Sequence, residues 1–239
     1  MLKNLNRMKH ALTEWAIKEG MLDDAQFISQ KEWHERHEVL HEDALLVMVI
    51  DGSGLYSLFN TGCDLTEFED LVESFGFCYE QGYAWSIGFY PIENYDYRRL
   101  SGTYASKLQD QRWQRKAALV KKEAGYICQD CGAKGSLEAH HCYYAIMSQG
   151  FEPWEYPLSA FRALCHTCHE TRPVPEIRIR AFLARLSQSQ LTGLIDGLDN
   201  GFNRFEVDSF IQFIKKATFD QKQMDEALNL LKKNTDLYD

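Results

Sequence analysis

The sequence predicts an α+β protein of 239 residues with a metal-binding module in its middle. Residues 1–43 carry apolar residues at helical spacing, and the stretch after them carries strand-length apolar runs separated by turns. Two C-x-x-C pairs follow, and beyond Pro173 the chain has only helical periodicity. The expected organisation is an α+β domain over 1–97, a basic helical linker over 98–124, a metal-binding module over 125–174 and an all-helical region over 175–239.

The N-terminal domain is expected to contain three helices and at least three strands. Leu5, Met8 and Leu12 recur every three or four residues, which predicts an amphipathic first helix. The sequence Asp-Gly-Ser-Gly at 51–54 predicts a turn between two strands. The expected helices are 2–16, 23–41 and 65–75, and the expected strands are 44–51, 55–60 and 83–90.

The C-terminal region is expected to form helical hairpins. Gly201 and Asn203 predict a break between successive helices, because both residue types favour turns. The expected helices are 176–186, 189–198, 206–217 and 221–233.

The composition is that of an ordinary globular protein, with 45% hydrophobic and 26% charged residues. No run approaches the roughly 20 apolar residues of a membrane span. Polar residues interrupt the first ten positions, which therefore lack the apolar core of a signal peptide. We expect a cytoplasmic protein with no membrane partner.

Basic residues are concentrated in the middle of an acidic chain of formal net charge −9. Residues 1–97 hold 6 Lys and Arg against 18 Asp and Glu, whereas residues 98–185 hold 14 against 8. A local basic stripe can bind phosphates even on an acidic protein, although a solvated helix face is the simpler alternative. The residues expected to contact nucleic acid are Arg112, Arg115, Lys116, Lys121 and Lys122.

Four of the seven cysteines form two C-x-x-C pairs. An odd number of cysteines without a secretory signal argues against a disulfide framework. Four thiolates in paired spacing are a ligand set that structural Zn²⁺ prefers. The sequence therefore predicts a zinc site formed by Cys128, Cys131, Cys165 and Cys168.

Three histidines accompany these cysteines: His140 and His141 in Glu-Ala-His-His, and His169 directly after the last cysteine. The combined pattern over 126–172 resembles the HNH endonucleases with a zinc knuckle, above all those of phages and bacteria. The resemblance implies a ββα-metal fold, with strands at 136–141 and 161–164 and a helix that starts near His166.

The resemblance also implies the roles of these histidines. His140 and His169 would bind a catalytic metal, and His141 would be the general base that takes a proton from water. Many members have Asp at the position of His140, so we expect Mn²⁺, Ni²⁺, Co²⁺ or Zn²⁺ to be favoured over Mg²⁺. The expected function is metal-dependent hydrolysis of phosphodiester bonds, with DNA as the expected substrate.

One position departs from the family pattern. Ala160 stands where the family has Asn to orient the general base, and Ser159 is the neighbour that could substitute for it. The alternative function is therefore a catalytically degenerate zinc module that binds DNA or a protein. A further alternative gives the acidic 1–97 domain a basic protein partner, or a shielding role over the nuclease, as would suit a toxin or a phage-defence effector.

His37-Glu-Val-Leu-His41 matches the H-E-x-x-H string of zinc proteases, in which Glu38 would be the base. This string needs a helix, and the charged residues on both sides of it differ from the apolar flanks of such helices. We favour a solvated helix at this place.

Overall fold

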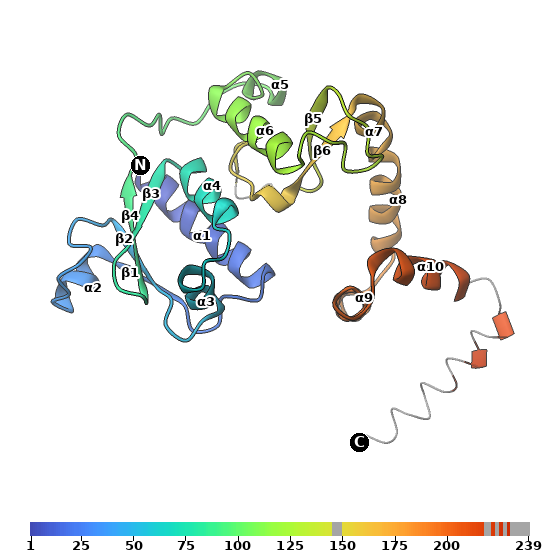
Figure 1. Cartoon of the computed structure of the whole chain (residues 1–239), viewed down its shortest axis with the longest axis horizontal. Helices are drawn as coiled ribbons and strands as arrows, with labels where there is room; N and C mark the ends of the chain where they lie inside the picture. Colours follow the sequence, from blue (N-terminus) through green and yellow to red (C-terminus); the bar gives the residue numbers. More distant parts are fainter. Residues whose placement is uncertain (145–149, 218–220, 223–224, 227–228, 230–239) are drawn as a thin grey trace. The chain divides into compact units, whose positions relative to one another are not determined.

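The structure is a computed structural model of the whole chain, described here for residues 1–144, 150–217, 221–222, 225–226 and 229. It divides into two compact units, Met1–Thr171 and Arg172–Asp239. The predicted boundaries at 97 and 124 fall inside the first unit. Figure 1 shows the order of the elements along the chain. No described helix combines the length and the apolar character that crossing a membrane requires.

A four-stranded antiparallel sheet forms the centre of the N-terminal part, with the order β1-β2-β4-β3. Its strands are β1 (Gln26–Ser29), β2 (Leu46–Val49), β3 (Phe77–Gln81) and β4 (Ser86–Pro91). Successive side chains of a strand point to opposite faces. In β2, Leu46 and Met48 therefore join one core cluster, whereas Val47 and Val49 join another. Both faces of this strand are buried.

Helices cover both faces of the sheet (Figure 1). The larger core contains apolar residues of α1 (Leu2–Lys18), α3 (Gly54–Asn60) and α4 (Thr66–Ser74). On the other face, Trp33 of α2 (Gln30–Glu35) packs against β1 and β2 residues. The spacing that predicted the first helix is confirmed, because Leu5, Met8 and Leu12 are all buried.

The structure corrects two predictions in this part. The expected helix over 23–41 is instead β1, the short helix α2 and turns, and His37 and His41 have left-handed φ angles of 57° and 66°. The H-E-x-x-H string is therefore not helical. The expected strand over 55–60 is the helix α3, whose Leu55 and Phe59, four residues apart, are buried on one side. The strand β3 was not predicted.

The second part of the first unit is built on an antiparallel pair of strands. β5 (Leu137–His141) pairs with β6 (Phe161–Cys165), and α7 (His166–Thr171) follows β6 directly. The short helices α5 (Tyr104–Lys107) and η2 (Leu158–Ala160) flank this pair, and α6 (Gln111–Glu123) packs against both strands. Two strands and a helix thus lie close to the positions expected for them.

Buried ion pairs join the two parts of the first unit. Lys116 of α6 is only 2% exposed, and its ammonium donates to a carboxylate oxygen of Asp70 on α4 and to the Tyr156 carbonyl, the latter at 2.8 Å. Arg7 of α1 pairs with Glu155, which is also buried. Buried charges of this kind need their partners, so the acidic N-terminal part and the basic helix α6 form one body.

The second unit contains α8 (Pro173–Leu183), α9 (Gln188–Arg204) and α10 (Val207–Ala217). Pro173 is at the start of α8, where proline suits the first helical turn. The expected break at Gly201 and Asn203 is wrong, because α9 continues through both residues to Arg204 and Phe210 of α10 packs against Phe202. The expected helix over 221–233 falls largely outside the described residues.

Candidate metal centre and histidine site

The first C-x-x-C pair lies in a tight turn before β5. Cys128 accepts a backbone hydrogen bond from Gly132, at 2.8 Å, and donates one to Ala133, at 2.9 Å. Gly132 has a φ of 74°, a conformation that glycine adopts without steric cost. This geometry turns Cys128 and Cys131 toward the same point. The second pair comes from the end of β6, Cys165, and from the first turn of α7, Cys168.

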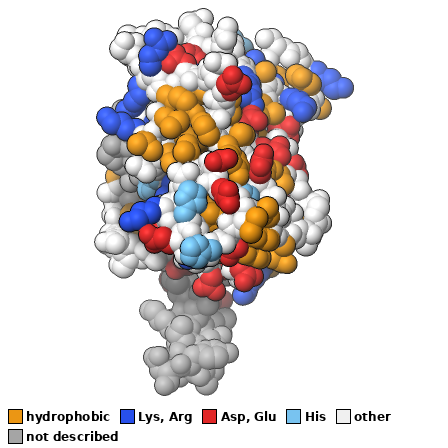
Figure 2. All heavy atoms as spheres, turned by 90° about the vertical axis from the view of Figure 1, so that its left-hand side faces the viewer, with side chains coloured by type: hydrophobic (Ala, Val, Ile, Leu, Met, Phe, Trp, Pro, Cys, Tyr) orange, Lys and Arg blue, Asp and Glu red, His pale blue; other side chains and the backbone are white. Residues whose placement is uncertain are grey.

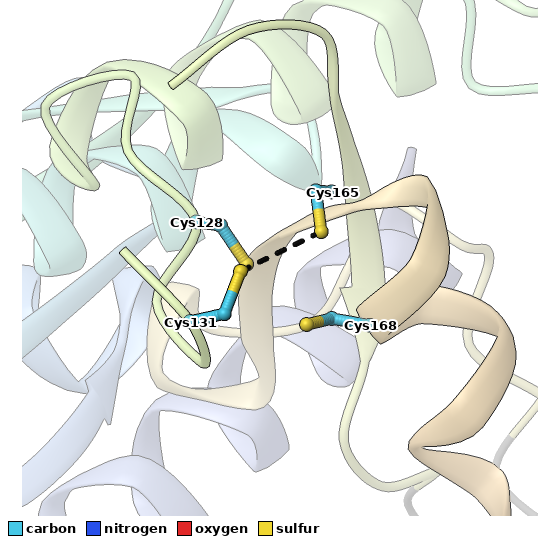
Figure 3. A group of neighbouring side chains, drawn as sticks. All are labelled: Cys128, Cys131, Cys165 and Cys168. Atoms are coloured by element: carbon cyan, nitrogen blue, oxygen red, sulfur yellow. Dashed lines mark hydrogen bonds between the residues drawn. The ribbon is translucent and has the colours of Figure 1, made fainter. Parts of the chain in front are cut away.

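Figure 3 shows the four cysteine side chains converging from these two segments. Their sulfur atoms all lie within 4.8 Å of one another, and Cys131 Sγ is 3.7 Å from Cys165 Sγ. Four sulfurs at about 2.3 Å from a tetrahedral zinc ion would be about 3.8 Å apart. The cluster therefore fits one metal ion such as zinc.

The surroundings of Cys128 favour its thiolate form, whereas the neighbouring Cys131 and Cys165 side chains raise the pKa of Cys168. Burial raises the pKa of this thiol, but backbone N–H groups of Cys165, Cys131 and Asp130 point toward the sulfur and lower its pKa to about 6. Among the described residues, these four cysteines are the only group of three or more His, Cys, Asp or Glu whose ligand atoms are gathered so closely.

His140 and His141 lie on opposite faces of β5, as alternation along a strand requires. His140 lies on the face that α7 covers. Its ring is perpendicular to that of His169, with 5.1 Å between the ring centroids. Two nitrogen ligands of one ion lie roughly 3 Å apart, which two imidazoles at this separation can reach by turning about their side-chain bonds.

Glu138, two residues before His140, lies beside two histidines of α7. Its Oε2 is 3.3 Å from His169 Nδ1, and its Oε1 is 3.0 Å from His166 Nδ1. The other ring nitrogen of His166 faces Glu170 at 3.4 Å. The hydrogen bond to Glu138, followed by the charges of Glu170 and Glu138, raises the pKa of His166. Its two carboxylate partners favour the imidazolium form, which has no lone pair for a metal.

His141 is 5% exposed and packs against two aromatic rings. Trp113 and Tyr144 both stack against it in near-parallel orientation, each with 5.1 Å between centroids. Its Nε2 is 2.9 Å from the Pro153 carbonyl, and its Nδ1 is 3.1 Å from the Tyr104 hydroxyl. A carbonyl only accepts hydrogen bonds, so Nε2 carries the hydrogen and Nδ1 accepts from Tyr104.

Burial lowers the pKa of His141 to about 4, against the opposing effect of the Pro153 carbonyl. The neutral ring that results is the form a general base needs, but its one lone pair is bonded to Tyr104. Neither Tyr104 nor Pro153 was predicted from the sequence. A tyrosine 37 residues before the histidine carries no local signal of this contact.

Ala160 is fully buried, and its carbonyl accepts from the Cys142 N–H at 2.8 Å. The Ser159 hydroxyl accepts from Lys18 Nζ at 2.9 Å, so it is engaged with α1 rather than with His141. Pro153 and Tyr104 are the groups that hold the His141 ring in the place of the expected side chain.

The five basic residues predicted to contact nucleic acid do not form a continuous exposed basic stripe, because three of them are in ion pairs. Lys116 is buried, which corrects its expected role, because its ammonium is enclosed by protein partners. Arg112 pairs with Asp110 and lies 4.2 Å from the Trp154 ring centroid, and Arg115 pairs with Glu73. Only Lys121 and Lys122 of the five form no ion pair in the part of the chain that the structure describes. Figure 2 shows one face of the molecule, on which acidic side chains lie among hydrophobic ones and basic side chains are scattered.

A cavity of about 470 Å³ lies beside the tyrosine side chains that contact His141. Tyr104, Tyr144 and Tyr156 line it together with two cationic side chains, Arg99 and Lys107. Both cations pair with Glu152, which is buried. These ion pairs fasten the segment containing α5 over His141.

Comparison with known proteins gives no relative for this chain: no family model, no curated protein and no solved structure matches it.

Proposed function

We propose that this chain is a metal-dependent endonuclease that hydrolyses phosphodiester bonds of DNA through an HNH-type site of the ββα-metal fold. The observation that carries the proposal is the approach of His140 on β5 to His169 on α7, 5.1 Å between ring centroids, next to the four-cysteine cluster. A structural four-cysteine zinc site needs neither histidine. Their approach supports a second metal position on this face of the strand pair.

The two metal positions have different tasks in this proposal. The thiolates of the four cysteines hold a zinc ion that ties the turn at 128–131 to β6 and α7. His140 and His169 would hold a divalent cation through their imidazole nitrogens. When bound, this cation stabilises the charge that develops on the phosphate and on the leaving oxygen.

His141 is assigned as the general base. Its neutral ring has a lone pair on Nδ1, 3.1 Å from the Tyr104 hydroxyl. A water can use this lone pair only after Tyr104 has moved from it. The proposal therefore requires the α5 segment to shift when the substrate binds, because a base must be within hydrogen-bond reach of the proton that it takes.

The proposal is tested by incubating supercoiled plasmid with the zinc-loaded protein and Mn²⁺, Ni²⁺ or Mg²⁺. We expect nicking or linearisation by the natural chain and loss of cleavage in His141→Ala and His169→Ala, with the zinc content unchanged. His10→Ala is the matched control, since His10 is on the exposed surface of α1. Cleavage that survives both site substitutions would contradict the proposal.

The identity of the cation is part of the proposal. Imidazole ligands are softer than the carboxylate found in many members of the family, so Mn²⁺ or Ni²⁺ should support faster cleavage than Mg²⁺. Equal or faster cleavage in Mg²⁺ alone would argue against two histidine ligands.

The second candidate function is a zinc module that binds DNA or a protein without cleaving. The observation that favours it is the enclosure of His141, whose ring nitrogens both have protein partners. A gel-shift assay separates the two candidates. Binding of DNA with unchanged affinity in His141→Ala, and no cleavage with any of the three metals, would support the non-catalytic module.

A further inference from the structure

We propose that Glu138 is a positioning residue that fixes the tautomer and the orientation of His169. The inference rests on the proposed function, in which His169 holds the cation. It gives a role to Glu138, a residue to which the motif resemblance assigned none.

The placement of Glu138 follows from two simple periodicities. Residues two apart on a strand share a face, so Glu138 and His140 project from the same side of β5. Residues three apart on a helix are neighbours, so His166 and His169 project together from α7. The Glu138 carboxylate lies between these two rings, 3.0 Å from His166 and 3.3 Å from His169.

The chemistry of the carboxylate decides which nitrogen of His169 is available. An ionised carboxylate only accepts hydrogen bonds, so Glu138, 3.3 Å from His169 Nδ1, favours the tautomer with the hydrogen on that nitrogen. In the neutral ring, the lone pair is then on Nε2, at the opposite edge. This arrangement of carboxylate, imidazole and ion is the one that fixes ring orientation and raises ligand basicity at metal sites.

His166 provides an internal comparison. Its Nδ1 forms a hydrogen bond of 3.0 Å with Glu138, whereas His169 Nδ1 lies at an ion-pair distance of 3.3 Å from the same carboxylate. The Nε2 of His166 faces a second carboxylate, that of Glu170. His169 has a carboxylate at one edge of its ring and the ring of His140 nearby. The same carboxylate thus prepares His169 for a cation, while Glu170 occupies the free edge of His166.

The test uses the full-length, zinc-loaded protein and has two readouts. Long-range ¹H–¹⁵N correlation spectra of the metal-free histidine site report the tautomer of His169. Mn²⁺ titration followed by electron paramagnetic resonance reports the affinity of the second site. The variants are Glu138→Ala, Glu138→Gln and, as the matched control, Glu170→Ala, which removes a carboxylate that faces His166 and leaves the Glu138–His169 ion pair in place.

We expect the Nδ1–H tautomer in the natural chain and its loss in Glu138→Ala, together with Mn²⁺ binding that is about 10- to 100-fold weaker. Glu138→Gln should be intermediate, because its amide oxygen still accepts from Nδ1 but carries no charge. Glu170→Ala should behave as the natural chain. All variants should keep their zinc.

An unchanged tautomer and an unchanged Mn²⁺ affinity in Glu138→Ala would overturn the inference and leave the proposed function standing. Absence of a second Mn²⁺ site in the natural chain would overturn the proposed function, and with it the role of Glu138.

Discussion

The hydroxyl oxygen of Tyr104 lies 3.1 Å from Nδ1 of His141, the nitrogen that carries the lone pair of this buried ring. The two residues are 37 positions apart in the chain. Tyr104 belongs to α5, whose Lys107 pairs with the buried Glu152. The group that would activate water is therefore held by a segment fastened through an ion pair to the interior.

Tyr104→Phe should increase cleavage of plasmid if His141 is the base. The substitution keeps the ring but removes the hydroxyl that competes for Nδ1. One hydrogen bond contributes about 1 kcal/mol, so we expect a gain of about fivefold in the single-turnover rate. Lys107→Met, which loosens the same segment without touching His141, should act in the same direction. A rate in Tyr104→Phe that falls together with that of His141→Ala would indicate that the hydroxyl itself takes part in the reaction.

Cys165→Ser should release the metal and destabilise the strand pair. Cys165 ends β6 and brings its sulfur to 3.7 Å from that of Cys131, so its loss opens the ligand set. Zinc content by mass spectrometry should fall below one ion per chain, and the melting temperature should fall with it, because metal binding at such sites contributes directly to folding. The exposed Cys63 is the matched control. Full zinc retention in Cys165→Ser would exclude the four-cysteine site.

Lys116→Ala should be strongly destabilising. Lys116 is buried and donates to Asp70, so its removal leaves a buried carboxylate without its cation, a change that typically costs about 3–5 kcal/mol. Urea unfolding should show this loss, whereas Arg115→Ala on the same helix should change the unfolding free energy by less than about 1 kcal/mol, since the arginine of the Arg115–Glu73 pair is mostly exposed. A small effect of Lys116→Ala would mean that this end of α6 is open to solvent.

Protonation of the His41 ring should make the protein less stable in mild acid. Burial lowers its pKa below the ordinary 6.5, against the opposing effects of a backbone hydrogen bond to Ser86 and of Glu80. The unfolded chain therefore takes up this proton at a higher pH than the folded one. The contribution of the neutral ring to stability is complete above about pH 6.5 and is lost as the pH falls toward the lowered pKa. An NMR titration of the His41 ring should give a midpoint below 6.5, and a midpoint at or above this value would contradict the burial.

The four-cysteine cluster was predicted from the local C-x-x-C spacing, whereas the strand pair was implied by the resemblance of the motif to the HNH endonucleases. The first C-x-x-C pair forms a compact turn, and the second joins the end of β6 to the first turn of α7. Alternation along 137–141 sends His140 and His141 to opposite faces. Local spacing also predicted α1, α4 and most of the C-terminal helices. It failed at 23–41 and 55–60, where short apolar patterns fit a helix and a strand equally well and packing on the sheet decided between them.

Tertiary structure alone decided which polar groups face solvent. Lys116 and its neighbours on α6 are equally basic in the sequence. Lys116 is buried because it lies on the side of the helix that faces Asp70, whose carboxylate forms an ion pair with its ammonium. In the same way, nothing in the sequence indicated that Tyr104 contacts His141 or that Glu138 contacts His169. Contacts between residues distant along the chain depend on how the elements pack, and this packing is fixed by the whole core rather than by the residues in contact.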